Sequence, residues 1–182
     1  NVPYSPKRFV TISNQGYQPG DYTMILGNPG STERYLSSWG INERVNNGNK
    51  ARIEIRGAKQ DVWKKYMLAN EAINIAYAGK YARSSNYWKN SIGMNSAIEK
   101  LKVVAQKQKQ EKEFDEWVKA DPQRVKKYGT VLKDLEDGYN TIFPYSHALS
   151  YLSESLLSGV ELPRMASMVK RGIKNNDSSE KI

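Results

Sequence analysis

The chain has 182 residues with a formal charge of +9, and 38% of its residues are hydrophobic and 10% aromatic. The aromatic content argues against a disordered chain, and the length suits one domain, or one domain with part of another. The absence of cysteine excludes disulfide bonds, thiolate catalysis and cysteine-bound zinc. No apolar run approaches the ~20 residues that cross a bilayer, so we expect no membrane span.

The first 30 residues predict two β-strands. β-Branched and apolar side chains dominate residues 8–13 and 22–26, and glycine, proline and asparagine between and after them provide turn chemistry. Two strands alone are only marginally stable in water. We therefore expect the rest of this sheet to lie outside the chain.

The pattern becomes helical after residue 30, and we expect residues 31–173 to form a helical domain. Ser31-Thr32 is placed to cap a first helix, which the polar run 46–49 is expected to end. Apolar or small residues then recur every three or four positions over 51–66, which predicts a second helix. Asn70 is placed to cap a third helix, which carries a face of small residues.

Further helices are predicted from capping and proline signals. Their expected starts are Ser96, Asp121, Pro144 and Pro163, and expected ends lie at Asp137-Gly138 and Gly159. Residues 174–182 are polar and are expected to form a disordered tail.

The positive charge raises the question of nucleic-acid binding. The lysines of residues 100–112 fall all round a helix, because successive residues are about 100° apart. Acidic residues at 111–116 are interleaved with them. This pattern is typical of a solvated helix of mixed charge, and it predicts no nucleic-acid partner.

His147 is the only histidine, and no acidic residue stands four positions from it to orient its ring. Metalloprotease, nucleophile-elbow and P-loop spacings do not occur. We interpret His147 as an ordinary surface or partly buried histidine, and we expect neither a metal site nor a cofactor.

Residues 77–95 combine aromatic rings, small residues and three asparagines, of which Asn86 is one. A helix that only filled a core would carry leucine and isoleucine on one face and charge on the other. Uncharged amides beside aromatic rings indicate a surface that faces something polar. The residues alone do not specify its use.

Several stretches carry a family resemblance. The most specific is Ser85-Asn86-Tyr87-Trp88-Lys89, and the others lie at 1–7, 20–24, 27–35, 55–57, 63–64 and 77–82. On these stretches the chain resembles the bacterial serine dipeptidyl-peptidases of the dipeptidyl-peptidase 7 and dipeptidyl-peptidase 11 group. The resemblance extends from residue 1 to about residue 172.

The resemblance implies a chymotrypsin-like double β-barrel with a helical cap domain inserted over the active site. Residues 1–30 would then be strands of the first barrel and 31–173 part of the cap, giving a mainly α chain within an α+β protein. The Ser-His-Asp triad of the family lies outside the matching segment. The chain is therefore expected to be an internal fragment without catalytic residues.

The family removes dipeptides from free N-termini, so the implied partner is a peptide substrate. The family residue that accepts the substrate's α-ammonium group matches Asn86. The resemblance also implies a periplasmic or secreted location, although no signal peptide is recognised in this chain, and it allows a homodimeric parent protein. The alternative is a free-standing helical module that binds peptide or nucleic acid.

Overall fold

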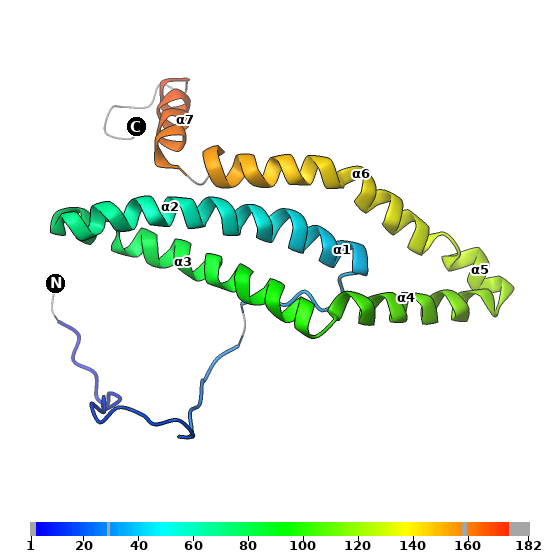
Figure 1. Ribbon diagram of the computed structural model, residues 1–182, viewed down its shortest axis with the longest axis horizontal. Coiled ribbons are helices and arrows are strands. Elements are labelled where there is room, and N and C mark those ends of the chain that lie inside the picture. The colour runs from blue at the N-terminus through cyan, green and yellow to red at the C-terminus, as the bar shows by residue number, and fades with distance from the viewer. Residues whose placement is uncertain (1–2, 29, 158–159, 175–182) are drawn as a thin grey trace. The chain divides into compact units, whose positions relative to one another are not determined.

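The computed structural model describes residues 3–28, 30–157 and 160–174. The chain divides into two compact units, Asn1–Arg34 and Tyr35–Ile182. All helices of the described residues belong to the second unit (Figure 1). The fold class is therefore mainly helical.

The two predicted strands do not form in this structure. Among the described residues of the first unit there is neither helix nor strand, and the side chains of Val10 and Ile25 are about nine-tenths exposed. A tight turn does form where the sequence predicts one: the Asp21 N–H donates to the Gln18 carbonyl at 3.1 Å, and Gly20 adopts a φ of +99°. Strand residues need neighbouring strands for their backbone groups, and the described chain supplies none.

The second unit begins with a continuous helical segment. Ser37 caps α1 (Ser38–Glu43), its hydroxyl accepting from the Gly40 N–H at 3.2 Å. The chain continues through a wider π-helical stretch, η1 (Arg44–Asn49), into α2 (Lys50–Ala69). The predicted start at Ser31-Thr32 is wrong, because the first helix begins at Ser38. The predicted break at 46–49 is also wrong, because Asn47 and Asn49 are buried against neighbouring helices and the backbone stays helical.

The predicted cap at Asn70 is confirmed, since its side-chain oxygen accepts from the Ile73 N–H at 3.1 Å. The helix that it caps, α3 (Glu71–Lys100), continues through the predicted start at Ser96. Lys102, with a φ of 51°, separates α3 from α4 (Val103–Lys119).

The predicted cap at Asp121 is also confirmed: its carboxylate accepts from the backbone of Gln123 at 2.7 Å, at the start of α5 (Pro122–Tyr128). The following helix, α6 (Val131–Leu152), runs through both Gly138 and Pro144, where the sequence predicts boundaries.

A proline inside a helix removes one backbone hydrogen bond and favours a bend there, and Figure 1 shows α6 curving along its length. The last helical segments are η2 (Ser153–Leu157) and α7 (Glu161–Lys174). The predicted end at Gly159 and, from residue 175 on, the predicted tail lie outside the described residues.

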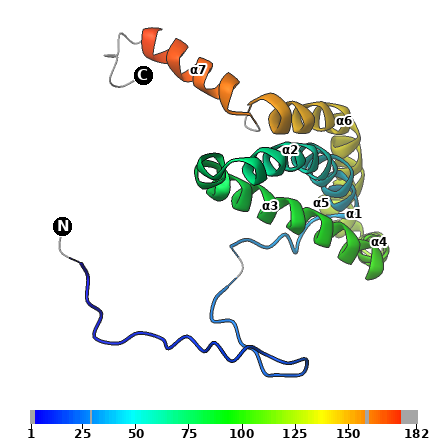
Figure 2. The same ribbon diagram turned by 60° about the vertical axis from the view of Figure 1, so that its left-hand side comes forward.

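The helix α2 lies between α3 and α6 (Figures 1 and 2). The most buried side chains of the described residues are small or polar: Asn47, Asn49, Ala51 and Ser91 are each at most 1% exposed. Buried polar groups require hydrogen-bond partners, and Asn47, Asn49 and Ser91 each take part in a hydrogen bond to a residue of another helix. This arrangement fixes the face of α3 that carries the candidate site.

Candidate functional site

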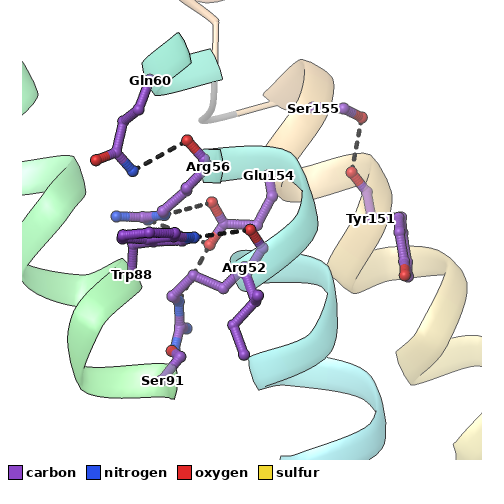
Figure 3. Close-up of polar contacts among 9 residues, drawn as sticks. Arg52, Arg56, Gln60, Trp88, Ser91, Tyr151, Glu154 and Ser155 are labelled. Atoms are coloured by element: carbon purple, nitrogen blue, oxygen red, sulfur yellow. Dashed lines mark hydrogen bonds and ion pairs between the residues drawn. The ribbon is translucent and has the colours of Figure 1, made fainter. Parts of the chain in front are cut away.

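An ion-pair node joins α2, α3 and η2 (Figure 3). The Glu154 carboxylate accepts two bonds from Arg56, from Nε at 2.8 Å and from Nη2 at 3.2 Å, and a third from Arg52 Nε at 3.3 Å. Arg52 also donates from Nη1 to the hydroxyl of Ser91 at 3.2 Å, which links the node to α3. The paired donors of Arg56 fix both the distance and the orientation of η2 against α2.

The charges of the node explain the state of Glu154. Burial by itself raises the pKa of its carboxyl, but the hydrogen bonds and positive charges of Arg56 and Arg52 outweigh burial, so the pKa lies below its ordinary value. Glu154 is therefore ionised at neutral pH and holds the two guanidinium groups together.

The aromatic residues of the family-specific stretch anchor α3 on α2. The Trp88 indole Nε1 donates to the Ile53 carbonyl at 2.9 Å, and a Cβ on Gly57 would lie 3.3 Å from the same Nε1. The Arg56 guanidinium lies over the Tyr87 ring, 5.2 Å from its centre. Trp88 thus fits against Gly57, and this contact sets the rotation of α3 about its axis relative to α2.

That rotation leaves Asn86 exposed. Among the residues that the structure describes, its side chain makes no hydrogen bond or ion pair. Helical periodicity places Asn86 on the same face as Gly79, where an added Cβ would meet nothing within 4 Å. The Asn86 amide is therefore available to a group outside the described chain.

His147 is not brought near Asn86 by any contact. Its Nδ1 lies 3.2 Å from Asn47 Oδ1, while Asn47 Nδ2 donates to the Phe143 carbonyl at 2.9 Å. Because the amide nitrogen is used in this way, Oδ1 faces the ring and His147 Nδ1 carries the proton. The ring also packs on Tyr151 at 4.8 Å. These contacts give His147 a structural role between α6 and η1.

No local sequence signal reveals the node, because Glu154 stands 98 and 102 positions from its two arginines. The described residues contain no group of three or more histidine, cysteine or acidic side chains suited to a metal ion. Nor is any described helix both long enough and apolar enough to cross a membrane.

The chain is similar to known proteins along nearly its whole length. Residues 1–181 match the family described as Peptidase S46. The chain is 44% identical over 178 residues to "Dipeptidyl-peptidase 7" of Porphyromonas gingivalis, covering 98% of this chain and 25% of that protein. It is 48% identical over 166 residues to "Dipeptidyl-peptidase 7" of Porphyromonas endodontalis, covering 91% and 20%.

A third relative, "Asp/Glu-specific dipeptidyl-peptidase" of Flavobacterium psychrophilum, is 40% identical over 162 residues, which are 89% of this chain and 23% of the relative. The chain therefore belongs to a family of peptidases, the peptidase S46 family. It spans about a quarter of the length of these relatives.

Proposed function

We propose that this chain is part of a serine-type dipeptidyl-peptidase that removes dipeptides from the free N-termini of peptides. The observation that carries the proposal is the match to peptidase S46 along residues 1–181, together with relatives that are named dipeptidyl-peptidases. Residues 31–173 would form part of a helical cap over the active site. The mainly helical second unit supports this assignment.

Residues 1–30 would complete a chymotrypsin-like barrel in the longer protein. Their β-branched side chains are exposed in the described chain, as expected for strands whose neighbours lie elsewhere. The catalytic triad would be supplied by the rest of the protein, in the periplasm or outside the cell. This chain would hold no catalytic residue and would contribute to substrate binding.

Asn86 would accept a hydrogen bond from the α-ammonium group of the substrate. A dipeptidyl-peptidase must fix the distance from the substrate's N-terminus to the bond that is cut, and a neutral amide oxygen can accept from an ammonium without adding a second charge. The exposure of Asn86 supports this role. So does the anchoring of α3 by Trp88, because a positioning group must stand on a rigid element.

The test is substitution of Asn86 in the longer peptidase. A hydrogen bond to a charged group contributes about 1.5–3 kcal/mol, so Asn86→Ala should lower kcat/KM by about tenfold to a hundredfold. Asn86→Asp should retain more activity, since a carboxylate still accepts the bond. The melting temperature should change little, because the Asn86 side chain forms no hydrogen bond with the described residues.

Asn74→Ala is the matched control, as Asn74 is another exposed amide of α3. If Asn86→Ala lowers the melting temperature while kcat/KM per folded molecule stays at the unmodified value, Asn86 is a structural residue and the assignment is wrong.

A further inference from the structure

A cavity of about 640 Å³ lies between α2, α3 and the segment that begins α7. Its charged lining is dominated by cations: Arg56, Lys59, Lys80, Arg83 and Arg164 face a single carboxylate, that of Glu161. Such a concentration of like charge is unfavourable unless an anion offsets it.

The acidic residues at hand account for only part of this charge. Lys80 Nζ forms an ion pair with Glu161 at 2.5 Å, and Arg56 is held by Glu154. For Arg83 and Arg164, the described part of the chain provides no ion pair. These two guanidinium groups, one from α3 and one from α7, are therefore available to a ligand in the cavity.

The environment of Lys59 is consistent with an excess of positive charge. Burial and the positive charge of Arg56 lower the pKa of its ammonium group, and the attraction of Glu154 offsets this only in part. An anion in the cavity would counter the same repulsion.

A second cavity, of about 450 Å³, adjoins the first, and the two share Lys59, Trp63, Val160 and Glu161. Its lining is largely apolar, with Tyr77 from α3 and Leu162 and Met165 from α7. The rings of Trp63 and Tyr77 lie edge to face at 5.6 Å. A ligand that fills both cavities must combine a negative group with an apolar body.

We propose that these adjoining cavities bind an acidic peptide segment. A side-chain carboxylate of the peptide would accept paired hydrogen bonds from Arg83 and Arg164, and a neighbouring apolar side chain would pack on Trp63 and Tyr77. The choice of a peptide, among anions with an apolar body, rests on the proposed peptidase function. The site is separate from Asn86, which lines neither cavity.

The experiment measures binding of a fluorescein-labelled, N-acetylated peptide that carries aspartate and glutamate beside leucine, by fluorescence polarisation. Acetylation removes the α-ammonium group, so the result does not depend on the role of Asn86. The matched ligand has asparagine and glutamine in place of the acids. Inorganic phosphate and dodecanoate serve as competitors.

Arg83→Gln and Arg164→Gln should each weaken binding of the acidic peptide by about tenfold or more. Arg171→Gln is the control, because Arg171 is an exposed arginine of α7 that lines neither cavity. It should change the Kd by less than about twofold. Trp63→Ala should weaken the acidic and the amide peptide alike.

Several results would overturn the proposal. Equal losses for Arg171→Gln and Arg164→Gln would show that only overall charge matters. Equal affinity for the acidic and amide peptides would remove the carboxylate from the site. Displacement of the peptide by phosphate or dodecanoate at lower concentrations than by unlabelled acidic peptide would show that the site is built for another anion.

Discussion

Substitution of Glu154 should cause a large loss of stability. Glu154→Gln keeps the shape of the side chain but removes the charge that faces Arg52 and Arg56. The side chain of Glu154 is 13% exposed and those of the arginines 24% and 20%, so water can replace the lost bonds only in part. Loss of one partner from a fully buried ion pair costs about 3–5 kcal/mol, while one hydrogen bond to a charged group contributes about 1.5–3 kcal/mol. For this partly buried node we expect a loss of about 2–4 kcal/mol.

The assay is thermal and urea unfolding followed by circular dichroism. For a chain of this size, 1 kcal/mol corresponds to about 2–4 °C in Tm, so Glu154→Gln should lower Tm by about 4–16 °C. Glu136→Gln removes an exposed carboxylate from α6 and is the control. A loss of stability no larger than that of Glu136→Gln would refute the reasoning that the node holds η2 on α2.

The node also predicts a dependence on pH. The pKa of Glu154 is lower in the folded than in the unfolded chain, so its contribution is complete above the unfolded value, about 4.3 for a glutamic acid. The contribution is lost as the pH falls through the folded pKa. The difference in unfolding free energy between the unmodified chain and Glu154→Gln should therefore be constant near neutral pH and shrink below about pH 4.3.

Other predictions concern close packing, charge and catalysis. A Cβ at Gly40 would lie 2.6 Å from the Tyr139 hydroxyl oxygen, so Gly40→Ala should lower stability by about 1–3 kcal/mol, and adding Tyr139→Phe should restore part of the loss. Nucleic-acid binding should be weak, because lysines of α4 pair with carboxylates four residues away. The affinity should fall only slightly as salt is added, since each phosphate contact contributes about 0.9 to the slope of log K against log salt concentration. Sub-micromolar, sequence-selective binding at physiological salt would contradict this. The 182-residue chain alone should release no dipeptide from a fluorogenic substrate, and release that His147→Ala abolishes would show that the chain holds a catalytic residue after all.

The sequence by itself determined the features that depend on neighbouring residues. Asn70 and Asp121 are recognisable as caps because a cap bonds to backbone groups two or three residues further on. The helical class follows from apolar spacing, and the Gln18–Asp21 turn from proline and glycine. The family is recognisable from short stretches such as Ser85–Lys89, since recognition depends on residue identity alone and not on conformation.

Only the tertiary structure decided the features that depend on residues far apart in the chain. The polar run 46–49 favours a turn locally, yet Asn47 is buried and bonded to α6, which keeps the backbone helical. The exposed position of Asn86 follows from the fit of Trp88 against Gly57, across two helices. Conversely, residues 8–13 and 22–26 have strand-forming side chains but no strand among the described residues, because a strand needs hydrogen-bond partners from other segments. Local sequence sets which conformations are favourable, and long-range contacts select among them.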